Sequence, residues 1–195
     1  ATALRRTLRS ITGLALTAAL VSTLLLCVGD IPRFAHPEAA PATVELSDGW
    51  TLTSTRDEPA GGAVVSTTGY RDDAWHRIET MPAPVLEALR ADGTYPDPYY
   101  GENLLEKIPQ DLYLQDWWYR TTFDAPAGHS TYRLTFPGIN YRAEVWLNGH
   151  LVAGATDVVG MYVEHDLDIT AWVDRGGHNV LAVKILPERG MQDVD

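Results

Sequence analysis

Apolar and polar residues alternate with a period of two along most of the chain, and turn residues separate the alternating runs. Successive side chains of a strand point to opposite faces of a sheet, so this pattern predicts an all-β fold. Strands are expected at Val44–Leu46, Trp50–Ser54, Ala63–Thr67, His76–Thr80, Trp118–Phe123, Thr131–Phe136, Ile139–Leu147, His150–Ala153, Tyr162–Leu167 and Asn179–Leu186.

The clearest hairpin is centred on Asn148-Gly149, between an apolar run that ends at Leu147 and another that begins at His150. A two-residue type I′ turn needs positive φ at both central positions, and Asn-Gly is the preferred pair for it. The sequence therefore predicts both a hairpin and its register.

One segment departs from the β pattern. Pro84–Arg90 begins with proline and places apolar residues on one helical face, which predicts a short helix. The following residues, Ala91–Asn103, are rich in proline, glycine, aspartate and tyrosine. Loops of this length in compact domains are usually functional or disordered, and the tyrosines and prolines favour an ordered, functional loop.

The N-terminus has the pattern of a secretory signal peptide, expected to span residues 1–42. Arginines precede an apolar run from about Leu14 to Val28, and Ala40-Pro41-Ala42 offers small residues for cleavage. A membrane anchor is the alternative, but the run falls short of the roughly 20 apolar residues that a span needs. We expect the mature domain, residues 43–195, outside the cell and not held in a membrane, and we expect further domains after it.

The chain is strongly acidic, with a formal net charge of −11. Such a surface repels phosphate backbones and anionic lipid, so no nucleic-acid or membrane-surface partner is expected. Solubility outside the cell explains the charge, and attraction of a cationic glycan such as chitosan is the sharper alternative. The single cysteine, Cys27, lies in the predicted signal, so the core must hold the domain without a disulfide.

No recognised nucleophile motif or glycine-rich phosphate loop is present, and the histidines lack the paired spacing of metal ligands. No cofactor or metal is expected. Glu164, Asp166 and Asp168 share one face of a predicted strand and could ligate calcium, although a solvated outer face is the preferred interpretation.

Aromatic residues give a better indication, because indole and phenol rings pack on the C–H faces of sugars while amides and carboxylates bind the hydroxyls. Trp117 and Trp118 are adjacent, so in a strand they point to opposite faces, and one of them is expected to face solvent, a ligand or another domain. Asp97 and Asn103 bracket the tyrosine-rich loop. They could bind sugar hydroxyls or simply stabilise turns.

Four strings in order resemble the N-terminal domain of glycoside hydrolase family 2, closest to its exo-β-D-glucosaminidase and β-mannosidase branch. They are DPYYGENL at Asp97–Leu104, DWWYRTTFDAP at Asp116–Pro126, FPGINYRAEVWLNGHLV at Phe136–Val152 and DLDITAWVDRGGHNVLAVKI at Asp166–Ile185. The resemblance implies a jelly-roll β-sandwich like that of galactose-binding domains, followed by an immunoglobulin-like domain and a catalytic (β/α)₈ barrel.

The resemblance also implies a retaining enzyme with two catalytic glutamates about 5–5.5 Å apart in the barrel, so no catalytic residue is expected here. It points to Asp97, Tyr99, Tyr100, Asn103 and Trp117 as substrate-binding positions on a pocket for a β-linked amino sugar or mannose. The barrel of the same polypeptide would be the partner. A stand-alone carbohydrate-binding module and a purely structural sandwich remain the alternatives.

Overall fold

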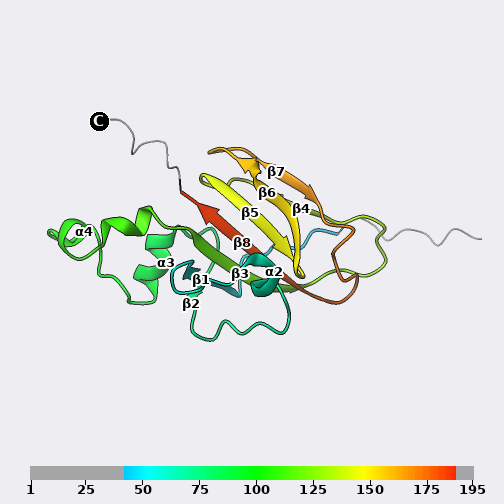
Figure 1. Cartoon of the computed structure of the whole chain (residues 1–195), viewed down its shortest axis with the longest axis horizontal. Helices are drawn as coiled ribbons and strands as arrows, with labels where there is room; N and C mark the ends of the chain where they lie inside the picture. The colour runs from blue at the N-terminus through cyan, green and yellow to red at the C-terminus, as the bar shows by residue number, and fades with distance from the viewer. Residues whose placement is uncertain (1–41, 188–195) are drawn as a thin grey trace, which may run out of the picture. The chain divides into compact units, whose positions relative to one another are not determined.

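The computed structural model describes residues 42–187, so nearly all of the predicted signal peptide lies outside the described residues. The described part is mostly β, as expected, and its strands form two antiparallel sheets (Figure 1). One sheet has six strands in the order β2-β1-β3-β8-β5-β6, and the other pairs β4 with β7. The strands are β1 (Trp50–Ser54), β2 (His76–Ile78), β3 (Trp117–Asp124), β4 (Arg133–Phe136), β5 (Arg142–Leu147), β6 (His150–Val159), β7 (His165–Asp168) and β8 (His178–Leu186).

The helices are short and lie in the connections between strands. They are α2 (Gly62–Val65), α3 (Val85–Ala91), α4 (Asn103–Glu106) and the 3₁₀ helix η1 (Gln110–Tyr113). In α3 the predicted helix is confirmed, with Pro84 as its N-cap in an extended conformation. None of the helices between residues 42 and 187 has the length and apolar character that a membrane crossing requires.

The hairpin prediction is confirmed at β5 and β6. Asn148 and Gly149 have φ values of 51° and 86°, and Leu147 pairs with His150 across the turn. Asn148 also ties the turn to its surroundings, because its side-chain amide donates to Asn179 Oδ1 at 2.7 Å and its Oδ1 accepts from Val180 N at 2.9 Å. The side chain that permits the turn therefore also fixes it to β8.

Other parts of the chain pack on both faces of the six-stranded sheet. Its inner face packs in one continuous core with residues of the two-stranded sheet and with α3. Its outer face carries a second apolar cluster, in which Val65 and Trp75 cover Trp118 and Ala182. Because side chains alternate along a strand, successive residues of β3, β8 and β5 point to the inner face and the outer face by turns.

Neither Trp117 nor Trp118 faces solvent in the described chain, so that alternative is wrong for both, while contact with a ligand or another domain stays a prediction. The two rings do leave β3 on opposite faces, but Trp117 is 7% exposed and Trp118 only 2% exposed. Trp117 belongs to the inner core and Trp118 to the outer cluster. A solvent-facing ring was expected because the sequence suggested only one covered face of the sheet, whereas the segment 60–75 covers the outer face.

Arg120 of β3 fixes that covering segment to the sheet. Its guanidinium donates to Val65 O at 2.9 Å and to Asp72 Oδ2 at 2.8 Å, and it lies over the Tyr70 ring at 5.7 Å. Tyr70 in turn donates its hydroxyl to Glu58, and burial together with this bond raises the Tyr70 pKa to about 12. A buried arginine that donates to several acceptors therefore stabilises the outer face, together with the apolar cluster on that face.

Two expected strands are absent, and others are shorter than expected. Ala63–Thr67 was expected as a strand, but α2 spans Gly62–Val65, where an indole packs on Gly62 and a helical turn buries Val65. Val44–Leu46 forms no strand; its Leu46 carbonyl instead accepts the indole N–H of Trp50 at 2.8 Å. The strand expected from Tyr162 begins at His165, because a turn with positive φ at Gly160 and Tyr162 precedes it.

Candidate functional site

The predicted functional loop follows α3 and is fixed at its base by Asp92. The Asp92 carboxylate accepts from Thr94 N at 3.0 Å and Thr94 Oγ1 at 2.6 Å, and it pairs with His76 of β2 at 2.5 Å. Burial acts to raise the pKa of Asp92, but the hydrogen bonds from Thr94 and His76 outweigh it and hold the pKa below its ordinary value of 3.8. The start of the loop is therefore held at the end of α3 and tied to β2.

Asp97 and Asn103 hold the tip of the loop in shape. Asp97 Oδ1 accepts from Tyr99 N at 2.9 Å, while its backbone carbonyl accepts from Tyr100 N at 3.3 Å and from Asn103 Nδ2 at 2.9 Å. These bonds stabilise a turn, which is the alternative role that the sequence offered for both residues. The structure brings four of the five predicted site residues into this one loop, and their contact with a sugar stays a prediction.

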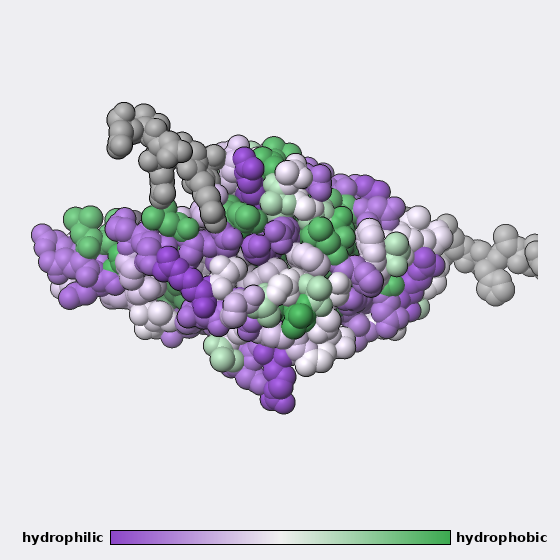
Figure 2. Space-filling view, viewed as in Figure 1, coloured by the Kyte–Doolittle hydropathy of each residue, from purple (hydrophilic) through white to green (hydrophobic). Residues whose placement is uncertain are grey.

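The two tyrosines between these residues point into solvent. Tyr99 is 94% exposed and Tyr100 is 77% exposed, which is unusual for large aromatic side chains in an ordered loop. Leu104 and Leu105 of α4, which follow this loop in the chain, are also exposed, and Tyr113 and Leu114 at the end of η1 are half-exposed. Figure 2 shows apolar surface at this α4 end of the molecule, which in Figure 1 lies furthest from β4 and β7.

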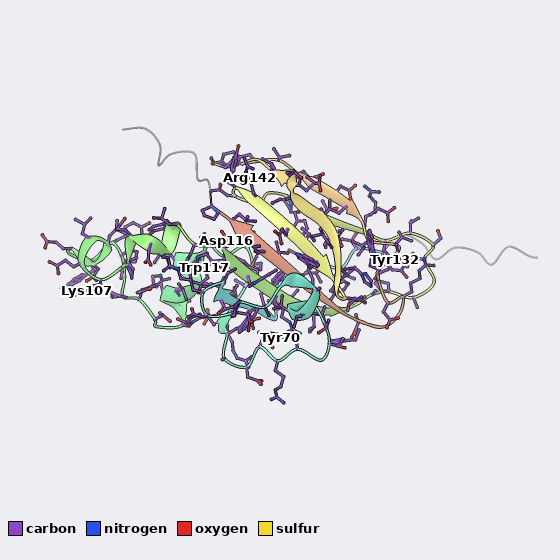
Figure 3. The ribbon with its side chains drawn as sticks, viewed as in Figure 1. Tyr70, Lys107, Asp116, Trp117, Tyr132 and Arg142 are labelled. Carbon is purple, nitrogen blue, oxygen red and sulfur yellow. The ribbon has the colours of Figure 1, made fainter. Side chains whose placement is uncertain are left out.

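The fifth predicted site residue, Trp117, lies away from the loop tip. Figure 3 shows it at the start of β3, whereas Lys107, just after α4, lies at the far end of the projecting segment. The Trp117 indole N–H donates to Leu112 O at 3.1 Å, and this bond ties η1 to the sheet. Trp117 thus supports the segment that carries the exposed aromatic residues.

Trp117 is also part of the wall of an open groove of about 740 Å³. The groove lies over β1, β3 and β8, between the segment that leads into α3 and the turn after β6. Tyr119 stands in its floor and donates its hydroxyl to Ala83 O at 3.0 Å, and burial raises the pKa of this tyrosine. The sequence did not predict the groove, because its residues come from six separate segments.

A smaller depression of about 270 Å³ lies on the outer face of the sheet, beside α2. Glu144 accepts from the Trp146 indole at 3.2 Å and from Lys184 Nζ at 3.2 Å. Glu58 binds the Tyr70 hydroxyl and the Ala60 amide. These polar groups therefore satisfy one another within the domain.

Two of the three carboxylates considered for calcium, Asp166 and Asp168, have partners within the domain. Asp166 pairs with Arg133 of β4 at 2.8 Å, and Asp168 accepts from Thr170 N at 2.9 Å. Between residues 42 and 187, no three histidine, cysteine or acidic side chains converge as a metal site.

Comparison with known proteins supports the sequence resemblance. The family described as glycosyl hydrolase 2 galactose-binding domain-like matches residues 50–193. An exo-beta-D-glucosaminidase of Streptomyces avermitilis is 34% identical over 180 residues, which are 89% of this chain and 20% of that enzyme. Beta-mannosidase B of Emericella nidulans is 30% identical over 141 residues, which are 71% of this chain and 15% of that enzyme.

The fold agrees with a solved relative. The crystal structure of the Amycolatopsis orientalis exo-chitosanase CsxA superposes with a TM-score of 0.66 at 33% identity, covering 72% of this chain and 16% of that one. The chain thus spans about a fifth or less of the length of these enzymes. From its matched residues, its sequence identity and its fold, the chain belongs to the family of glycosyl hydrolase 2 galactose-binding-like domains.

Proposed function

We propose that this chain is the N-terminal, pocket-shaping domain of a secreted retaining β-glycosidase that releases β-linked glucosamine or mannose. The similarity to two exo-beta-D-glucosaminidases and to beta-mannosidase B supports this assignment. The chain's small share of each relative favours a part of a larger enzyme over a stand-alone binding module. The jelly-roll order of the sandwich, the domain bounds 43–195 and the signal peptide belong to the same proposal.

The main support for the proposal is that the backbone of the Asp97–Asn103 loop is ordered although its aromatic side chains are exposed. Four hydrogen bonds fix the backbone of this loop, yet the loop presents two phenol rings to water. Rigid exposed aromatic residues are typical of surfaces that bind, because their rings give contact area at little entropic cost. Sugar C–H faces pack on such rings, and the phenol hydroxyls can bind sugar hydroxyls.

Asn103 adds an acceptor to this surface. Its Nδ2 is engaged by the Asp97 carbonyl, which fixes the orientation of the amide and leaves Oδ1 to accept from a sugar hydroxyl. Asp97 acts mainly through its turn, since its carboxylate accepts from the Tyr99 backbone amide. We assign Trp117 a supporting role through Leu112, with sugar contact as the remaining prediction for its ring edge.

The chemistry itself requires two carboxylates that flank the glycosidic bond, one as acid/base and one as nucleophile. In the proposal both come from the barrel of the parent enzyme. This domain positions the non-reducing sugar, and such positioning lowers the barrier by holding the bond against the catalytic pair. A pocket wall supplied by a separate domain also helps to exclude water.

The test compares single substitutions in the longest polypeptide that the open reading frame encodes, assayed on 4-nitrophenyl β-D-glucosaminide and β-D-mannoside. Tyr99→Ala and Tyr100→Ala are expected to raise KM or lower kcat/KM by about tenfold, the equivalent of about 1.4 kcal/mol of lost contact. Tyr162→Ala is the matched control, because Tyr162 is also 94% exposed but lies outside the loop. Equal kinetics for all three variants would remove the loop from the sugar pocket.

A further inference from the structure

The shape of the Asp97–Asn103 loop and its position relative to the sheet depend on different contacts. The hydrogen bonds described above for the loop tip join residues of the loop to one another, and Lys107 N donates to Asn103 O at 2.9 Å just after it. These bonds fix the tip internally but do not set its direction relative to the sandwich. That direction depends on the two places where the segment meets the rest of the domain.

The attachment after the loop is apolar. Ile108 and Leu112 are 2% and 3% exposed, and the indole N–H of Trp117 donates to Leu112 O at 3.1 Å. The position of η1 therefore follows from side-chain packing in the core.

The attachment before the loop is polar and uses both oxygens of the Asp92 carboxylate. Oδ1 accepts from the backbone N–H and the hydroxyl of Thr94, and these two bonds span Gly93. Gly93 has a φ of 82°, and a Cβ atom there would meet nothing within 4 Å, so no neighbouring group packs on the turn at this point. Oδ2 of Asp92 contacts Nδ1 of His76 at 2.5 Å. One oxygen therefore shapes the turn, and the other ties it to β2.

His76 supplies the directed part of this attachment. Burial acts to raise the pKa of Asp92, but the hydrogen bonds hold it below its ordinary value, so near neutral pH the carboxylate is ionised and Nδ1 of His76 is the donor. A hydrogen bond to an ionised acceptor is roughly twice as strong as one between neutral groups. His76 pairs in the sheet with Leu52 of β1, which is fully buried. Beyond the turn, Tyr95 packs partly buried against the core, but apolar packing is not directional.

We propose that His76 is a positioning residue of the sugar-binding loop: it holds Asp92 Oδ2, fixes the turn at Gly93 and so sets where Tyr99 and Tyr100 meet the sugar. The inference rests on the proposed function of the loop. His76 acts through Asp92 and does not contact the sugar. Without the imidazole, Asp92 keeps its bonds to Thr94, so the turn survives but loses its attachment to β2. Binding groups keep their geometry only when such supporting contacts fix them.

Three substitutions in the longest encoded polypeptide separate positioning from packing. His76→Ala removes the donor, His76→Asn keeps an amide N–H near the place of Nδ1, and His76→Gln carries its amide further out, near the place of Nε2. His178→Ala is the matched control, because His178 forms the same kind of pair with Asp124 at 3.0 Å, at the end of β3 opposite to Trp117.

Steady-state kinetics on 4-nitrophenyl β-D-glucosaminide and β-D-mannoside give the first readout. His76→Ala is expected to raise KM about fivefold and to change kcat less than about twofold, because the loop holds the sugar but takes no part in bond cleavage. His76→Asn should restore the wild-type KM, and His76→Gln should not. If Tyr99→Ala raises KM while His76→Ala behaves like His178→Ala, the positioning role is overturned and the proposed function stands.

Hydrogen exchange followed by mass spectrometry gives a second readout that needs no substrate. Peptides that cover Thr94 and Tyr95 should exchange severalfold faster in His76→Ala than in His76→Asn or His178→Ala, because the turn opens more often once β2 no longer holds Asp92. Peptides that cover residues 99–107 should not change, since the bonds of the tip remain. Equal exchange in His76→Ala and His178→Ala would overturn the proposal by itself. Faster exchange in His76→Ala, with KM unchanged in both His76→Ala and Tyr99→Ala, would support the attachment through His76 and instead contradict the proposed sugar-binding role of the loop.

Discussion

The side-chain amide of Asn103 donates a 2.9 Å hydrogen bond to the backbone carbonyl of Asp97, and this bond closes the loop that exposes Tyr99 and Tyr100. The contact joins the first residue of α4 to the loop before it, so the helix start and the loop tip move as one unit. A loop fixed in this way presents its aromatic residues without paying their ordering entropy at each binding event.

Replacement of this amide should loosen the loop without unfolding the domain. Asn103→Ala is expected to speed protease cleavage within residues 98–102 severalfold, while the melting temperature changes little, because one exposed hydrogen bond contributes only about 1 kcal/mol. Glu102→Ala is the control, since the Glu102 side chain makes no cap bond to α4. Unchanged cleavage in Asn103→Ala would show that the bond does not order the loop.

A second prediction concerns the close approach of Gly62 to Trp146. A Cβ atom on Gly62 would lie 2.2 Å from the indole ring, whereas one on Gly61 would meet nothing within 4 Å. Gly62→Ala should therefore destabilise the domain by about 1–3 kcal/mol through overpacking, and Gly61→Ala should have little effect. Urea unfolding followed by tryptophan fluorescence measures both, and similar midpoints for the two variants would contradict the packing of α2 on β5.

The buried arginine of the outer face gives a third prediction. Arg120→Lys keeps the charge but cannot reach Val65 O, Asp72 and Thr67 O together, so we expect a loss of about 2–4 kcal/mol. Arg133→Lys, in a pair that is half-exposed, should cost less than 1 kcal/mol. Equal unfolding free energies in the two variants would mean that Arg120 does not anchor the segment 60–75.

Acid stability should depend on Asp92, whose pKa in the folded state lies below its ordinary value of 3.8. The unfolded chain binds the proton more tightly, so this carboxylate stabilises the fold above pH 3.8 and loses that contribution as the pH falls through its lowered pKa. Asp92→Asn should have a lower free energy of unfolding than wild type at pH 7, and this difference should become smaller below pH 3.8. A difference that stays constant from pH 7 to pH 3 in urea unfolding would show that the Asp92 carboxylate does not stabilise the fold in this way.

The fold was largely predictable because its strands follow simple alternation, and the Asn148-Gly149 turn fixes one register by backbone geometry alone. The segment around Val65 was not, since its apolar residues fit a strand equally well and only the contact with Trp146 and Arg120 selects the helical turn. The burial of both Trp117 and Trp118 also depends on which loops fold over the sheet, and local pattern carries no information about that.

The part of the candidate site that lies in one continuous segment of unusual composition could be predicted from the sequence. The Asp97–Asn103 loop combines turn residues with tyrosines, so both its order and its exposure could be expected. The groove was missed because Trp50, Met81, Phe136 and Ile185 are far apart in the sequence and meet only through the topology of the sheet. Leu104-Leu105, an apolar pair in a polar segment, was the available signal for the exposed surface of α4.

Whether this domain shapes the sugar pocket of a β-glycosidase is measured by the hydrolysis of 4-nitrophenyl β-D-glucosaminide and β-D-mannoside by the longest encoded polypeptide, with Tyr99→Ala and Tyr162→Ala beside the wild type. We predict hydrolysis of one of these substrates and a loss of about tenfold in kcat/KM for Tyr99→Ala alone. Hydrolysis of neither β-glycoside, or full activity in Tyr99→Ala, would contradict it.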